Sequence, residues 1–404
     1  KIWIREGSRA DPTKQKGIHN LLGSLLSRGC GSYSNLEVAD LIEGHGASLT
    51  CETYEDGLMV SLKCIQDSSP KLIRLLNLII TEPLLKKDQV DLERNLSILA
   101  INRQNENPFN IAFNQWKKIA YSNHPYMHET LGVKQDLKGI TRENIISLSK
   151  DFISREKIVL FSGSLPKNVE NYIPNIKEIC LLDNVSIYSS PKINIIPKTN
   201  QNALVKQLII KPQETNQVVL ILGKSTIPYS NPDDLKLRLL SSHLGSGMSS
   251  VLFRILREEN GLSYDVGLYH PIREYQAPFL IHASSSTEKA KLTLKKIFQC
   301  WKNIIKHPIS DQELTLAKAK FLGNIAHNSQ TISQRAERKA YLMGLGLNIN
   351  HDLNSIQILK KITSEELLDS ASKYLKHPIL SLCGPKDELN NLKAYWEEVR
   401  NQDY

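Results

Sequence analysis

The sequence predicts an α+β protein with two tandem, homologous domains, and three observations support this. The 404 residues are 41% hydrophobic and 23% charged, which is typical of a globular chain with room for two or three domain-sized cores. A segment at residues 140–163 recurs at residues 362–385, an offset of 222 positions. Between the copies, residues 186–202 are rich in Ser, Pro and Asn without a helical period, which is typical of a linker. The predicted domains are therefore residues 1–185 and 203–404.

The two copies of the repeat predict the same succession of elements. Each begins with Ile-Thr-x-Glu, continues as an amphipathic helix with an aromatic residue near its end, and closes with an apolar strand that ends in glycine. Thr141 and Thr363 occupy the positions of helix N-caps. A repeat of this length indicates duplication of a domain and not a solenoid of short units. The matched pairs are Ile140/Ile362, Thr141/Thr363, Glu143/Glu365 and Phe152/Tyr374.

The first helix is predicted at residues 18–26, where apolar residues recur at i, i+3, i+4, i+7 and i+8. Asn20, Gly23 and Ser24 fall on the remaining face. Side chains at i and i+4 project side by side and can share one metal ion, but zinc takes its donors from Cys, His, Asp and Glu. Taken alone, this segment is an ordinary buried helix. Its apolar face consists of Ile18, Leu21, Leu22, Leu25 and Leu26.

In the second domain, an apolar stripe at residues 251–256 predicts a helix that ends before Gly261, and residues 262–268 alternate as a strand. Arg257 lies in the last helical turn and Tyr264 follows seven residues later. A guanidinium and a phenol could stabilise a developing oxyanion. Alternatively, Arg257 pairs with a nearby carboxylate and Tyr264 belongs to the core. Spacing alone leaves both interpretations open.

Residues 16–29, KGIHNLLGSLLSRG, resemble the zinc helix of the pitrilysin/insulinase-type metallopeptidases, family M16, which carries His-x-x-Glu-His. With the glycines of the motif on Gly17 and Gly29, Asn20 and Ser24 take the positions of the two histidine ligands. Gly23 takes the position of the glutamate that activates water. The segment 93–108 resembles the helix that carries the third ligand, and that position falls on Ala100, 80 residues after Asn20. The resemblance implies that all three ligands and the base are missing.

Further segments resemble the same family in family order, from the first residue to about residue 385. They are residues 1–12, 37–51, 124–132 and 243–267, the last matching the family pattern L-R-E-x-x-G-L-x-Y around Arg257 and Tyr264. The resemblance implies that each domain is a largely antiparallel sheet packed against helices, together forming a half-clamshell. It also implies that Arg257 and Tyr264 face the active-site chamber, bind the substrate backbone and stabilise the tetrahedral intermediate.

The function implied by the resemblance is that of a non-zinc subunit in a heterodimeric M16 peptidase, with no activity alone. An M16 partner carrying His-x-x-Glu-His would hold the zinc, so no cofactor is expected in this chain, and peptides would be the substrates. A homodimer is expected when the partner is absent. The alternative is a structural scaffold similar to the core subunits of the respiratory bc1 complex. A peptidase with a relocated metal site is the least favoured reading.

The charge distribution and the cysteine spacing indicate which classes of partner and which cellular compartment to expect. The net charge of +9 is spread along the chain and not concentrated in a basic patch, which argues against nucleic-acid binding. The sequence contains no run of about 18 apolar residues, so no membrane span is predicted. The six cysteines lack CxxC spacing and suggest reduced thiols in an intracellular, most simply cytoplasmic, protein. The chain starts without methionine, so we expect a trimmed chain or a fragment.

Overall fold

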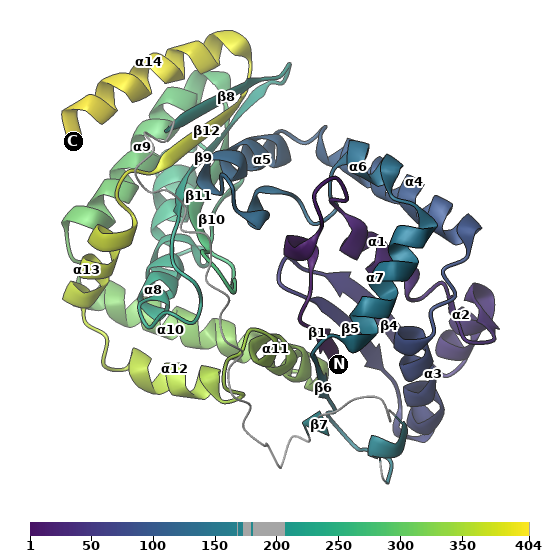
Figure 1. Ribbon diagram of the computed structural model, residues 1–404. Coiled ribbons are helices and arrows are strands. Elements are labelled where there is room, and N and C mark those ends of the chain that lie inside the picture. Colours follow the sequence, from purple (N-terminus) through teal and green to yellow (C-terminus); the bar gives the residue numbers. More distant parts are fainter. Residues whose placement is uncertain (168, 173–178, 181–206, 404) are drawn as a thin grey trace. The chain divides into compact units, whose positions relative to one another are not determined.

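The computed structural model describes residues 1–167, 169–172, 179–180 and 207–403, which pack as two compact units (Figure 1). Neither unit is one continuous stretch of sequence. Unit 1 comprises Lys1–Arg103, His128–Asn194 and His327–His351. Unit 2 comprises Gln104–Met127, Ile195–Ala326 and Asp352–Tyr404.

Each unit is built around a five-stranded sheet, and the two sheets have corresponding strand orders. In unit 1 the order is β4-β5-β1-β6-β7, and in unit 2 it is β10-β11-β9-β12-β8. Neighbouring strands are antiparallel except for the last pair in each sheet, β6 with β7 and β12 with β8. The strands are β1 (Ile2–Ile4), β4 (Ser48–Thr53), β5 (Leu58–Lys63), β6 (Lys157–Leu160), β7 (Ile179–Cys180), β8 (Leu208–Pro212), β9 (Gln217–Ser225), β10 (Val266–Tyr269), β11 (Pro278–Ser286) and β12 (Ile379–Gly384). A separate two-stranded sheet pairs β2 (Gly29–Cys30) with β3 (Tyr33–Ser34).

Helices form the remaining layers. Unit 1 contains α1 (Ile18–Leu25), α2 (Asn35–Glu43), α3 (Ser69–Thr81), nearly all of α4 (Lys87–Gln104), α6 (Lys134–Gly139), α7 (Arg142–Ser154) and α11 (Ile332–Gly344). Unit 2 contains α5 (Pro108–Ala120), α8 (Asp234–Gly245), α9 (Thr287–Lys306), nearly all of α10 (Asp311–His327) and of α12 (His351–Leu359), α13 (Ser364–Tyr374) and α14 (Lys386–Asp403). Short 3-10 helices are η1 (Ser8–Ala10), η2 (Gln66–Ser68), η3 (Pro125–Met127) and η4 (Val169–Tyr172), and η5 (Phe253–Glu258) is a π-helix.

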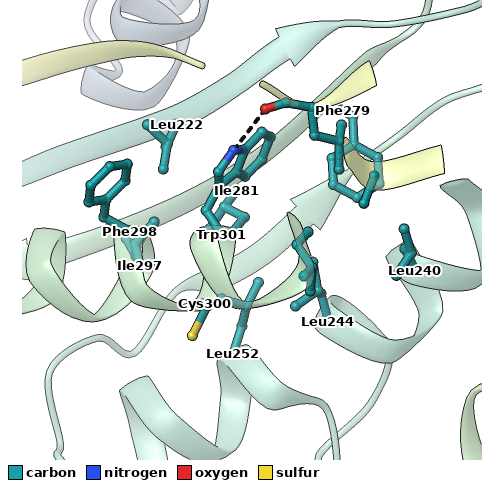
Figure 2. Packing of buried hydrophobic residues seen from close by; sticks show 14 of the residues in the cluster. Leu222, Leu240, Leu244, Leu252, Phe279, Ile281, Ile297, Phe298, Cys300 and Trp301 are labelled. Atoms are coloured by element: carbon teal, nitrogen blue, oxygen red, sulfur yellow. Dashed lines mark hydrogen bonds between the residues drawn. The ribbon is translucent and has the colours of Figure 1, made fainter. Parts of the chain in front are cut away.

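The central strands are apolar at successive residues because both faces of each sheet are covered. In β9, Val218, Leu220 and Leu222 join the large core against α9, whereas Val219 and Ile221 pack in a second cluster with α5. This alternation follows from the two-residue period of a strand. Figure 2 shows the large core of unit 2, where the indole Nε1 of Trp301 donates a hydrogen bond to the Leu375 carbonyl at 3.0 Å.

Unit 1 repeats this arrangement with other residues. Ile2 and Ile4 of β1 belong to the core that contains α1 and α3, whereas Trp3 points to the opposite face. There Trp3 packs with Ala336, Ala340 and Met343 of α11, and its ring meets that of Tyr341 edge-on with centroids 4.9 Å apart. The second face of the first sheet is therefore covered by a helix from the last quarter of the sequence.

The α+β prediction with largely antiparallel sheets is confirmed, and the repeat corresponds to α7 and β6 in unit 1 and to α13 and β12 in unit 2. The units differ from the predicted contiguous domains at residues 104–127, which pack in unit 2, and 327–351, which pack in unit 1. The reason is the second apolar face of each sheet, which α5 and α11 cover. The predicted linker, residues 186–202, lies outside the described residues.

Candidate functional site

Helix α1 begins where the zinc-helix resemblance places it. Gly17 precedes it with φ +103°, a left-handed conformation that a side chain would strain. The carboxylate of Asp11 accepts hydrogen bonds from the backbone N–H groups of Gly17, at 2.6 Å, and His19, at 3.2 Å. These bonds satisfy two of the free donors at the start of the helix. The frame of the metal-binding helix is thus preserved.

The side chains on this frame do not fit a zinc ion. The hydroxyl of Ser24 donates a hydrogen bond to the Asn20 carbonyl one turn back, at 3.1 Å. Gly23 is buried and offers no carboxylate. The position of the third ligand, Ala100, lies on α4 and is apolar. Within the described ranges, no three His, Cys, Asp or Glu side chains cluster closely enough to hold a metal ion. This donor set does not match the chemistry that zinc requires.

The space beside Gly23 is also occupied. A Cβ atom at this position would lie 2.6 Å from the Thr53 hydroxyl and 2.8 Å from a Leu58 methyl carbon. Both distances are shorter than a carbon atom tolerates, and Leu58 is fully buried. A glutamate side chain therefore has no room in the present packing. The side chains of Thr53 and Leu58 occupy the space that a glutamate base would need. The helix therefore lacks both the polar groups of a zinc site and the room for them.

Helix α4 retains Glu93, the first residue of the segment that resembles the family's third-ligand helix, although the ligand position itself is Ala100. The Glu93 side chain is mostly buried and accepts a hydrogen bond from Arg28 Nε at 2.7 Å, and a second guanidinium nitrogen of Arg28 forms the ion pair. Arg28 follows α1 closely, so this pair joins the end of the degenerate helix to α4. Ala100 lies two turns after Glu93 on the same helical face. The motif survives here as a structural ion pair.

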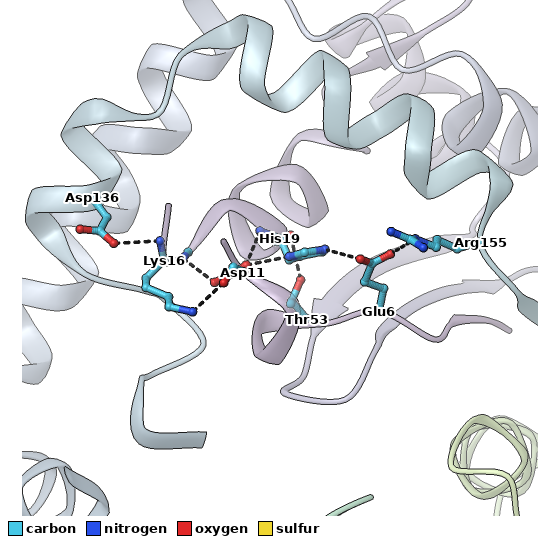
Figure 3. Close-up of polar contacts among 8 residues, drawn as sticks. Glu6, Asp11, Lys16, His19, Thr53, Asp136 and Arg155 are labelled. Carbon is cyan, nitrogen blue, oxygen red and sulfur yellow. Dashed lines mark hydrogen bonds and ion pairs between the residues drawn. The ribbon is translucent and has the colours of Figure 1, made fainter. Parts of the chain in front are cut away.

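Sequence reasoning missed a buried polar chain next to the degenerate positions (Figure 3). His19 is 1% exposed and lies between two carboxylates: Nδ1 is 2.7 Å from Asp11 Oδ1, and Nε2 is 3.8 Å from Glu6 Oε1. Arg155 forms an ion pair with Glu6. Burial alone would lower the pKa of His19, but the hydrogen bonds and negative charges of Asp11 and Glu6 raise it above its ordinary value. Asp11 and His19 flank Gly17 in sequence and could have suggested contact, whereas nothing in the sequence indicates Arg155.

This arrangement predicts a pH dependence of stability. A raised histidine pKa contributes stability that is fully present below the unfolded value, about 6.5, and is lost as pH rises through the folded value. His19→Gln should therefore lower the free energy of unfolding by about 1–3 kcal/mol at pH 6 and by less at pH 9. Urea unfolding at both pH values measures this difference. Exposed His327, changed to Gln, is the control, and equal losses for His19→Gln at both pH values would contradict the prediction.

Arg257 and Tyr264 lie together at the surface of unit 2. The Arg257 guanidinium stacks over the Tyr264 ring at 4.1 Å and lies 4.9 Å from the Phe253 ring. Tyr264 is 81% exposed, so the interpretation of Tyr264 as a core residue is wrong. No carboxylate in the described part of the chain forms an ion pair with Arg257. The stack therefore holds the guanidinium against an exposed aromatic ring.

The local backbone explains this exposure. Residues 253–258 form the π-helix η5 and not the α-helical turn predicted from the apolar stripe. Gly261 follows with φ +55°, and β10 begins at Val266, four residues later than the predicted start of the strand. Tyr264 therefore stands in the connection before the strand and is not part of its apolar face. Single-turn π-helices often occur at functional sites.

Two family models match the chain. Residues 1–134 match the one described as insulinase (peptidase family M16), and residues 140–321 match the one described as the peptidase M16 inactive domain. The two matches follow each other along the chain and together account for most of it.

Three relatives illustrate the range of similar proteins. An uncharacterized zinc protease of Rickettsia felis is 22% identical, with 96% of this chain and 92% of the relative covered. The non-peptidase homolog YmxG of Helicobacter pylori is 23% identical, covering 91% and 84%. The mitochondrial-processing peptidase subunit beta of Saccharomyces cerevisiae is 23% identical, covering 99% and 89%.

Solved structures share the fold. A peptidase M16 inactive domain from Pseudomonas fluorescens superposes with a TM-score of 0.81 at 20% identity, covering 95% of this chain and 92% of that one. A chain of complex III2 from Candida albicans gives a TM-score of 0.75 at 12% identity, covering 96% and 91%. At these identities the structures establish the fold and not the activity.

Proposed function

We propose that this chain, which belongs to peptidase family M16, is the non-zinc subunit of a two-chain zinc peptidase. The stacked pair of half-buried Arg257 and exposed Tyr264 is the observation that carries the proposal, because it occurs in a chain whose metal-ligand positions hold Asn20, Ser24 and Ala100. A partner M16 subunit with His-x-x-Glu-His would provide the zinc and the base. The names of two relatives, a peptidase subunit and a non-peptidase homologue, are consistent with such a division of labour.

In this proposal the chain contributes binding and electrostatic stabilisation to peptide hydrolysis. The Arg257 guanidinium, ordered by the ring of Tyr264, would hold carbonyl groups of the substrate backbone. The Tyr264 hydroxyl would donate a hydrogen bond to the oxygen that gains negative charge as the peptide carbonyl is attacked. Both groups can reach a ligand without rearrangement of the core, since the tyrosine is exposed.

A structural scaffold remains the second candidate function. The fold shared with a chain of complex III2 is consistent with it, but a shared fold at 12% identity carries no activity or assembly to this chain. The stacked pair of Arg257 and Tyr264 favours the first proposal, because a scaffold does not need an exposed phenol with a guanidinium stacked on its ring. No helix in the described part of the chain has the length and hydropathy of a membrane span.

We expect the isolated chain to bind no stoichiometric zinc at the Asn20/Gly23/Ser24/Ala100 positions and to cleave no peptide. Amide, hydroxyl and methyl groups cannot replace the imidazole and carboxylate ligands that zinc catalysis requires. Metal analysis of the purified protein, together with a peptide-hydrolysis assay with and without chelator, measures both expectations. One tightly bound zinc per chain with chelator-sensitive hydrolysis would refute the proposal of a non-zinc subunit.

Assembly provides the direct test of the proposed function. The tagged full chain, isolated from native lysate of its source, should retain an M16 subunit that carries His-x-x-Glu-His in equimolar amount. A stable pair of this kind should bury more than about 1,200 Å² of surface. Without the partner we expect a homodimer. A strictly monomeric chain at high concentration that retains no such subunit would count against the proposal. We also propose an intracellular compartment, because the spacing of the cysteines in the sequence is not that of a disulfide framework.

A further inference from the structure

A basic groove lies in unit 1, and none of the degenerate zinc-site positions lines it. It has a volume of about 750 Å³ and lies where the start of α4, the end of α6 and the start of α7 meet. Five cationic side chains and three carboxylates line it. The cations are Lys86, Lys87, Arg94, Lys138 and Arg142.

Two arginines fix the floor of this groove. Arg94 donates a hydrogen bond to the Ile140 carbonyl at 2.8 Å, and Arg142 Nε donates one to the Leu85 carbonyl at 2.6 Å. The two bonds run in opposite directions between the segment that holds α4 and the segment that joins α6 to α7. The groove is therefore preformed, because its walls are connected by hydrogen bonds of charged donors, which are stronger than neutral ones.

The carboxylates of the groove form an ion pair or local hydrogen bonds, whereas its lysines act on them only through longer-range charge, Lys86 on Asp88 and Lys87 on Glu143. Asp91 pairs with Arg94 at 2.6 Å, and local hydrogen bonds in the first turns of α4 and α7 lower the pKa values of Asp88 and Glu143. Helix N-termini therefore offer little to a ligand here. Within the described residues, the ammonium groups of Lys86, Lys87 and Lys138 form no ion pair or hydrogen bond. The unpaired charge of the groove is positive.

From this arrangement we propose that the groove binds a small polyanion with two or more phosphate or carboxylate groups. Three separate ammonium groups and the fixed Arg142 guanidinium around one concavity suit several anionic groups, each of which takes its own donor. The lining has no aromatic side chain to stack on a nucleobase, and Ile140 is its one large apolar residue. The recognised part is therefore the anionic groups and not an attached base or lipid chain.

Pyrophosphate and citrate are suitable probes for the full chain, because they carry phosphate and carboxylate groups of similar size. Calorimetric titration at low ionic strength should give saturable 1:1 binding of one or both probes. The probe that binds more tightly shows whether the groove prefers phosphate or carboxylate groups. Lys87→Ala/Lys138→Ala should weaken this binding about tenfold or more, since each substitution removes one charged hydrogen-bond donor from the groove. Binding should also weaken as salt is added.

Lys150→Ala is the matched control, because Lys150 is an exposed lysine on α7 that does not line the groove. It removes the same kind of charge, so it should leave the affinity within about twofold of wild type. Circular dichroism will verify that all variants fold, as expected for exposed substitutions. Absence of saturable binding of both probes would overturn the proposal. An equal loss of affinity in Lys150→Ala would also overturn it, because the attraction would then reflect overall charge.

Discussion

Tyr264→Phe should lower the kcat of the reconstituted two-chain peptidase about 10²–10³-fold while the complex still assembles and keeps the partner's zinc. The substitution removes one hydroxyl from a side chain that is 81% exposed, so the packing of unit 2 should not change. Loss of a single donor to a developing oxyanion typically has an effect of this size. Peptide hydrolysis by wild-type and variant pairs at equal zinc content measures it.

Arg257→Ala should lower activity as strongly and should also raise KM, because the guanidinium would bind the substrate backbone before and during the reaction. It also removes the group stacked on Tyr264 at 4.1 Å, so part of its effect would come from a less ordered phenol. The two variants thus differ in how their losses divide between kcat and KM.

The matched control is Tyr395→Phe. Tyr395 belongs to the same unit and also has a cation over its ring, Lys291 at 5.4 Å, but it lies on α14. Its hydroxyl should be dispensable for hydrolysis. Turnover near wild type for both Tyr264→Phe and Arg257→Ala would show that the stacked pair has no catalytic use. The scaffold interpretation would then be the better one.

The sequence predicted those parts of the fold that depend on local patterns. The glycines at positions 17 and 29 placed α1 correctly, and the repeated Ile-Thr-x-Glu segments located α7 with β6 and α13 with β12. Thr363 forms the predicted N-cap, since its side chain accepts a hydrogen bond from the Glu366 backbone. These features involve residues a few positions apart, so periodicity and capping chemistry suffice to recognise them.

The sequence did not reveal which sheet each helix covers. Helix α5 has an ordinary amphipathic pattern, and the buried residues Ala112 and Trp116 would suit either sheet. The choice depends on contacts with β9 and β12, such as the hydrogen bond from Trp116 to the Gly223 carbonyl, 107 residues further along the chain. Arg155 likewise meets Glu6 only through the fold. Amphipathicity identifies a buried face but not its partner, which explains why the domains were predicted as contiguous.

Gly23→Glu, which restores the position of the missing base, should destabilise unit 1 by about 3 kcal/mol or more. The new Cβ would lie 2.6 Å from the Thr53 hydroxyl and 2.8 Å from Leu58, and overpacking of this kind typically costs about 1–3 kcal/mol. The glutamate would in addition bring a charge into an apolar region, which is unfavourable without a paired cation. Denaturant unfolding of the isolated chain measures the loss.

Gly23→Ala separates the steric part from the charge. Helix propensity alone would make alanine more stable by about 1 kcal/mol, as expected for the control Gly323→Ala on α10, where a Cβ meets nothing within 4 Å. In α1 the contact with Thr53 should reverse the sign, and Thr53→Ala in the same chain should recover part of the loss. If Gly23→Ala proves as stabilising as Gly323→Ala, the site has room for a side chain. The missing glutamate would then be a loss of a chemical group only. If Gly23→Ala is destabilised, the packing of unit 1 depends on the absence of a side chain at position 23.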